Sequence, residues 1–148
     1  MAQDGRTGQL ERNYRRLLEL CDALEAIADD LPHPDAHLCV TTVDALEPLI
    51  EDTHMLEEEA LFPILLASGR PELHQTVARL RQEHLSDSDT AGEVSEAVHA
   101  LVTGHAIVSP DALGYLLRSF FGSMRRHVHG EIELIRLFLP DHDRKMMN

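Results

Sequence analysis

The sequence contains no tryptophan and has only two tyrosines, four phenylalanines, two cysteines, eight glycines and seven prolines in 148 residues. Cys21 and Cys39 cannot provide the disulfide framework of a small secreted domain, and they do not have the spacing of metal ligands. Leucine and alanine are abundant instead, and both are strong helix formers. We therefore expect an all-α protein with reduced thiols, as in the cytoplasm.

Long apolar runs and basic residues are also scarce. No segment approaches the roughly 18 continuous apolar residues of a membrane-spanning helix, and residues 1–16 lack the apolar run of a signal peptide. The 26 acidic residues outnumber the 13 basic ones, which gives a net charge of −13. Because an acidic surface repels phosphate groups, we expect neither nucleic acid nor a membrane as a partner. These features favour a cytoplasmic location.

Prolines and glycines divide the chain into four segments with apolar residues at alternating steps of three and four. The segments cover about residues 10–31, 36–67, 71–104 and 111–140. Amphipathic helices joined by short connections predict an antiparallel up-down-up-down four-helix bundle. We expect one domain over residues 1–148, with the bundle at about 8–140.

Several of the apolar stripes are interrupted by polar residues where leucine or valine is expected: His54, Glu58, His84, His127 and Glu131. Burying one unpaired charge costs several kcal/mol, and a whole domain is stable by only about 5–15 kcal/mol. These side chains therefore need a shared partner in the core, and a metal centre is the simplest one.

The spacing of these residues agrees with this interpretation. In His-x-x-x-Glu the two side chains lie one turn apart on the same helix face, and the pattern occurs as His54…Glu58 and His127…Glu131. His54 and His84 are equally distant from the connection between their helices, so antiparallel packing brings them to one level. Tyr14 reaches the same level on the first helix. The sequence thus predicts one polar layer across the bundle.

The motifs HMLEE (54–58) before LFP (61–63), LRQEH ending at His84, and HVHGE (127–131) resemble those of the hemerythrin-like, or HHE cation-binding, family. The resemblance covers nearly the whole chain, about residues 8–140. It implies a non-haem di-iron centre with two Fe per chain and an oxo or hydroxo bridge. It further implies that Glu58 and Glu131 bridge the irons and that His54, His84 and His127 are terminal ligands.

The sequence departs from the family pattern at Tyr14, where a histidine of the first helix is expected. Two interpretations stay open at this position. Tyr14 is either a phenolate ligand, deprotonated by ferric iron, or a core aromatic that leaves the site one ligand short or mononuclear. A phenolate would favour ferric iron, and with it peroxide or nitric oxide chemistry over reversible oxygen carriage.

The expected function is therefore binding of, or reaction with, O2, NO or H2O2 at a core metal site. An enzyme of this kind would be a di-iron oxidoreductase such as a catalase-like protein. The alternative is a regulatory or interaction bundle with zinc or mononuclear iron. A ferritin-like site needs Glu-x-x-His on two helices, but Glu96-x-x-His99 lies too far along its helix from His54.

The remaining histidines have simpler interpretations. His129 is two residues after His127, so it should face outward. We expect the other histidines near the far end of the bundle to be solvated: His33, His37, His99 and His105.

Overall fold

The computed structural model describes residues 2–139, with side chains from residue 5 onward. Its elements are α1 (Ala2–Asp29), α2 (Ala36–Leu56), the π-helical segment η1 (Glu57–Leu61), α3 (Phe62–Leu66), α4 (Pro71–Val102) and α5 (Pro110–Phe138). The described residues contain no strand, which confirms the all-α prediction.

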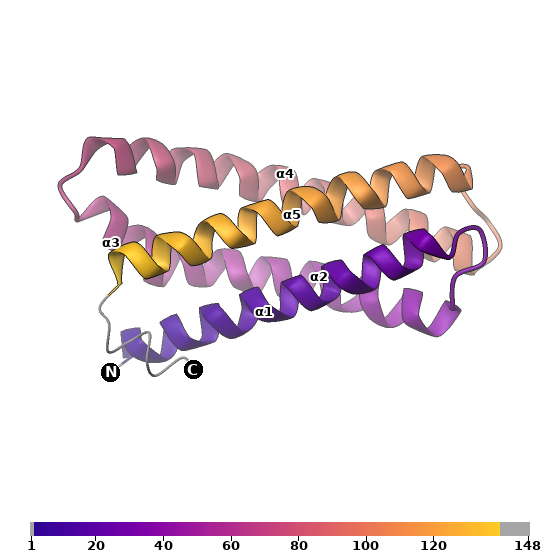
Figure 1. Ribbon diagram of the computed structural model, residues 1–148, viewed down its shortest axis with the longest axis horizontal. Helices are drawn as coiled ribbons and strands as arrows, with labels where there is room; N and C mark the ends of the chain where they lie inside the picture. The colour runs from indigo at the N-terminus through magenta and orange to yellow at the C-terminus, as the bar shows by residue number, and fades with distance from the viewer. Residues whose placement is uncertain (1, 140–148) are drawn as a thin grey trace.

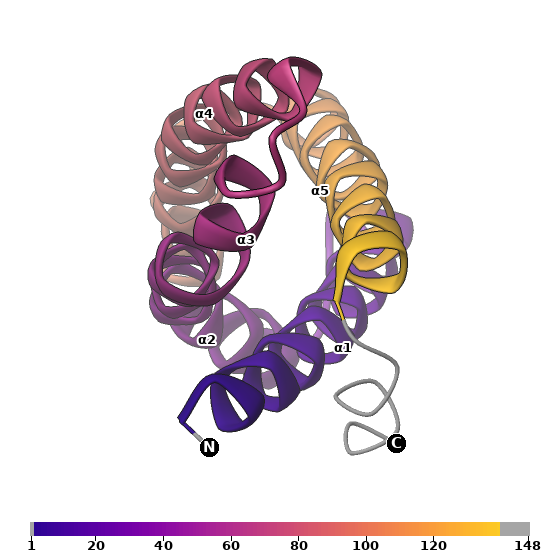
Figure 2. The same ribbon diagram turned by 90° about the vertical axis from the view of Figure 1, so that its left-hand side faces the viewer.

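The four long helices form the predicted bundle (Figure 1). α1 packs against α2 and α5, and α4 packs against the same two helices, so the helices form a closed ring (Figure 2). Each long helix runs antiparallel to the next one in the chain. The end of α2, the start of α4 and the end of α5 meet at one end of the molecule.

Local sequence signals set most helix boundaries. Asp35 accepts a hydrogen bond from the backbone of Leu38 and caps α2, and Ser109 accepts one from Ala112 and caps α5. Gly69 and Gly104 adopt φ values of 77° and 81° after α3 and α4, a conformation that glycine adopts without strain. The first helix begins at Ala2 and not near Leu10, and the predicted end of the last helix at residue 140 lies outside the described residues.

The core is built from the apolar stripes of all four long helices, for example Leu24, Leu46, Val98 and Leu117. Towards the end that carries α3, polar side chains enter this core, and the buried ones include Glu57, His84, Asp87 and Glu131. No helix within residues 2–139 is both long enough and apolar enough to cross a membrane.

Candidate metal centre

The junction between α2 and η1 directs Glu57 into the core. Glu57 is 1% exposed and continues the buried face formed by Ile50 and Thr53. At this point the helix widens, because the backbone N–H of Phe62 bonds to the carbonyl of Glu57, five residues earlier. The widened turn adds a residue to the helix, so that Glu57 and Phe62, five positions apart, are both buried.

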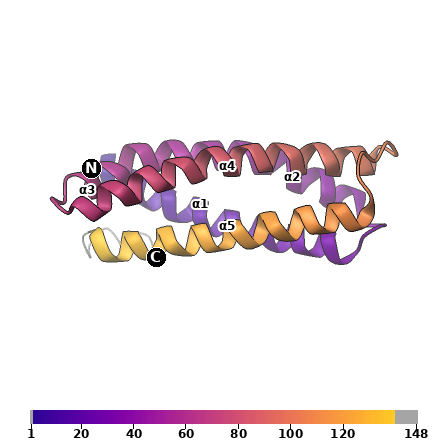
Figure 3. The same cartoon turned by 90° about the horizontal axis from the view of Figure 1, so that it is seen from above.

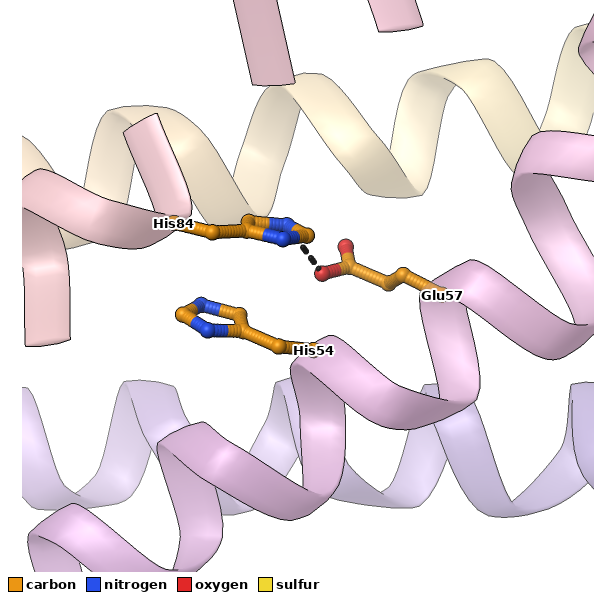
Figure 4. A group of neighbouring side chains, drawn as sticks. All are labelled: His54, Glu57 and His84. Atoms are coloured by element: carbon orange, nitrogen blue, oxygen red, sulfur yellow. Dashed lines mark ion pairs between the residues drawn. The ribbon is translucent and has the colours of Figure 1, made fainter. Parts of the chain in front are cut away.

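Three donor side chains converge beside this turn (Figure 4). His54 and Glu57 come from the α2–η1 segment and His84 comes from α4, and one ligand atom from each lies within 4.8 Å of the others. The rings of His54 and His84 are stacked, with centroids 3.8 Å apart and planes 10° from parallel. Two imidazoles and a carboxylate thus face one small volume between two helices.

Two atoms in this group have unmet hydrogen-bonding capacity. His84 Nε2 and Glu57 Oε1 lie 2.8 Å apart as an ion pair. Both atoms are buried, and neither has a hydrogen-bond partner among the described residues. Because buried polar atoms are normally paired, two orphaned donor atoms in contact fit a site built for a cation.

Tyr14 and Glu131 surround Glu57 from the other two helices. The Tyr14 hydroxyl donates a hydrogen bond of 2.8 Å to Glu57 Oε2, and the tyrosine is fully buried. Burial and the nearby Glu57 raise the pKa of Tyr14 well above its usual value, so the phenol is protonated in the absence of a metal. Tyr14 therefore lies at the predicted level, while its coordination as a phenolate stays a prediction.

Glu57 and Glu131 form a buried carboxyl pair. Burial and the charge of Glu57 raise the pKa of Glu131 well above its usual value. Burial opposes ionisation of Glu57 too, but His84, Glu131 and Tyr14 outweigh it and lower the pKa of Glu57. Without a metal, ionisation of both carboxyls at once is opposed, and the proton is favoured at Glu131.

His127 belongs to the edge of this layer and is held by Asp87. Its Nδ1 lies 3.0 Å from Asp87 Oδ2, and its Nε2 lies 3.7 Å from a carboxylate oxygen of Glu83. The hydrogen bond to Asp87 raises the pKa of His127 and outweighs its partial burial. Asp87 lies on the apolar stripe of its helix, as His84 does. The sequence alone could therefore have identified Asp87 as a polar residue of the core.

The structure places Glu58 outside the group, in contrast to the sequence interpretation. Its carboxylate is 44% exposed and forms a two-pronged ion pair with Arg81, with distances of 2.8 Å and 3.0 Å. Glu57 occupies the core position instead, because the buried face of α2 runs through Thr53 and not through Met55. The other predicted residues, Tyr14, His54, His84, His127 and Glu131, all lie in or beside the polar layer.

The protonation of His54 suits a ligand. Burial, and secondarily the neighbouring His84, lower the pKa of His54 to about 4. The imidazole is therefore neutral near pH 7, and neutral imidazole is the form that binds metals.

A four-helix bundle whose core holds histidines and carboxylates from facing helices defines a class of metal-binding helical proteins. The chain matches the family model of the hemerythrin HHE cation-binding domain over residues 8–136. It belongs to this family, whose members bind iron or other metals. Comparison with curated proteins gives no match, and comparison with solved structures gives none either.

Proposed function

We propose that this chain is a non-haem iron protein whose core site binds or reacts with a small ligand, namely O2, NO or H2O2. The observation that carries the proposal is the buried group of His54, Glu57 and His84 with its two orphaned donor atoms. Two histidines and one carboxylate with open positions are the ligand set of many non-haem iron sites.

The ligand set can be extended to two irons per chain. His54, Glu57 and His84 would hold one iron, and Glu131, His127 and Asp87 would hold the second. Glu57 and Glu131 interact directly and belong one to each group, so they are the candidates for bridging carboxylates. In this proposal Glu57 takes the role that the family resemblance gave to Glu58.

The surrounding residues position these ligands. The hydroxyl of Tyr14 fixes one oxygen of Glu57, and Asp87 fixes the ring of His127. Phe62 stacks on His84, with ring centroids 5.5 Å apart, and separates it from solvent. Bound iron would supply a redox-active centre that accepts a small oxidant or diatomic molecule.

Tyr14 bears on which ligand is used. As a phenolate it would stabilise ferric iron, which favours decomposition of peroxide or a response to nitric oxide over reversible oxygen carriage. A peroxide-decomposing, catalase-like activity is the enzymatic form of this proposal. Ferric iron would have to displace the phenolic proton, as metals do with other protic ligands.

A second candidate is a regulatory bundle with zinc or a single iron and no catalysis. Within the described residues, one group of three side chains, His54, Glu57 and His84, has its potential metal-ligand atoms within 4.8 Å of one another. His127 already has a carboxylate partner in Asp87. One metal ion would satisfy this arrangement.

Elemental analysis of protein from iron-supplemented cells, with a visible spectrum of the same sample, tests the proposal. Two irons per chain with a phenolate-type band that Tyr14→Phe abolishes would support the di-iron site and its tyrosine ligand. One iron, or a band that survives Tyr14→Phe, would leave Tyr14 as a hydrogen-bond donor to Glu57. Zinc in place of iron would favour the regulatory candidate, and no transition metal would refute both.

Cys21 and Cys39 are free and buried. Reduced thiols fit a reducing compartment, and we place the protein in the cytoplasm on this basis.

A further inference from the structure

A pocket on the surface between α4 and α5 leads to the candidate metal centre. These two helices run alongside each other (Figure 3) and contact each other directly. The pocket between them has a volume of about 320 Å³. It is lined by Thr76, Arg79, Leu80, Glu83, Arg126, His127, Gly130, Glu131 and Leu134.

The inner wall of this pocket is part of the metal centre. Glu131 is buried beside Glu57, and His127 is partly buried and held by Asp87. Both line the pocket, as does the buried Leu80. A molecule in the pocket would therefore touch two of the side chains that we propose as ligands.

The outer wall carries two cations on a strongly acidic protein. Arg79 and Arg126 are exposed, whereas the whole chain has a net charge of −13. Arg79 lies 4.0 Å from Glu83, which also lines the pocket. Arg126 forms no ion pair with any residue that the structure describes. Because Arg79 is paired with Glu83, Arg126 is the guanidinium at the mouth of the pocket that leaves a local positive charge there.

Gly130 lines the same pocket and has no side chain to fill it. It is an exposed residue in the middle of α5, where glycine is unfavourable by about 1 kcal/mol relative to alanine. A Cβ atom added here would meet nothing within 4 Å. The glycine is thus not required by packing, and its φ is not in the left-handed region. Gly130 therefore leaves this part of the pocket lining without a side chain.

We propose that the α4–α5 pocket is the passage by which a small neutral or singly negative ligand reaches the core site, and that Gly130 keeps it open. The inference rests on the proposed function, because it assumes a metal behind His127 and Glu131. The volume of about 320 Å³ admits a ligand of a few atoms. The two arginines select against small cations and raise the local concentration of anions.

The experiment measures how fast sodium azide binds to the iron-loaded, oxidised protein, followed by stopped-flow absorption. Gly130→Phe should slow association by about tenfold or more and leave the equilibrium affinity within about twofold, because a blocked passage slows entry and exit alike. Gly130→Ala should associate at the unsubstituted rate. Gly5→Phe is the matched control, since Gly5 is also exposed and a Cβ there also meets nothing within 4 Å.

A second variant tests the charged mouth without adding bulk. Combined Arg79→Gln and Arg126→Gln should slow azide association several-fold at low salt and flatten its dependence on ionic strength. The control variant combines Arg12→Gln and Arg15→Gln on α1. It makes the same change in net charge at exposed positions outside the pocket, and it should not change the association rate comparably.

The outcomes separate this inference from the proposed function. If the unsubstituted protein binds no iron, the proposed function fails and the passage fails with it. If it binds iron and azide, and neither Gly130→Phe nor the double arginine variant slows association, only the passage is refuted. If Gly130→Phe loses iron, the double arginine variant decides, and an unchanged association rate would overturn the inference.

Discussion

Glu57 and Glu58 are adjacent in the sequence, yet one is in the core and the other is at the surface. Glu57 touches Tyr14 and His84, while Glu58 pairs with Arg81. Arg81 also lies over Phe62, 5.5 Å from the ring centroid, so the surface ion pair covers the ring that stacks on His84. At the scale of single residues, Glu58 thus helps to shield the candidate metal centre from solvent, and Glu57 is one of its potential metal ligands.

Substitution of each glutamate by glutamine distinguishes these roles. Glu57→Gln should weaken iron binding by more than about tenfold, because it removes an anionic donor from the buried group. Glu58→Gln should keep the iron content and change the stability by no more than about 1 kcal/mol, since an exposed ion pair contributes little. Iron per chain after dialysis and thermal unfolding measure the two effects. Loss of iron in Glu58→Gln with retention in Glu57→Gln would restore the original assignment.

Among the elements, η1 decides which residues after Glu57 face the core. Pro63 cannot donate a backbone hydrogen bond and would crowd the carbonyl of residue 59 in a regular α-helix. The π-helical turn that precedes it widens the helix at this point. Widened turns of this type occur frequently at functional sites, and here the turn begins at Glu57 itself.

Element boundaries can be tested at α5, which carries His127, Gly130 and Glu131. Ser109→Ala should lower the free energy of unfolding by about 1 kcal/mol, because it removes the cap of the Ala112 backbone N–H. For a chain of this size that corresponds to a fall of roughly 2–4 °C in Tm. Ser119→Ala, at an exposed position inside the same helix, is the matched control and should not lower the Tm. Equal effects of the two changes would argue against the cap.

At the scale of the whole molecule, the bundle combines a large apolar core with one polar layer. Apolar side chains from all four long helices pack on both sides of this layer, so the fold does not depend on the layer alone. The polar layer nevertheless holds a buried carboxyl pair and two orphaned donor atoms, and both reduce stability when no cation is present.

Metal removal should therefore lower stability without unfolding the bundle. A metal present at about a thousandfold above its Kd adds roughly 4 kcal/mol, or on the order of 10 °C in Tm. The expected result of chelation is a lower Tm with an unchanged far-ultraviolet circular dichroism spectrum at 25 °C. Glu57→Gln should show a smaller shift at the same metal concentration, which ties the effect to the site. Equal Tm values for loaded and chelated protein would contradict metal binding in the core.

The sequence by itself determined the helical class, the breaks between helices and the level at which polar residues enter the core. These features follow from local signals, namely proline and glycine positions, caps and the helical repeat of apolar residues. His54, His84, His127, Glu131 and Tyr14 were predictable because each interrupts, or lies on, an apolar stripe.

Only the tertiary structure decided which glutamate of the 57–59 run faces inward. A helical repeat locates a face to within about one residue, and here the packed face of α2 passes through Thr53 to Glu57 and not to Glu58. Sequence spacing also could not show that Tyr14 donates to Glu57, that Asp87 holds His127, or that Gly130 and Glu131 line one pocket. Each of these depends on contacts between residues far apart in the chain, which form only when the helices pack.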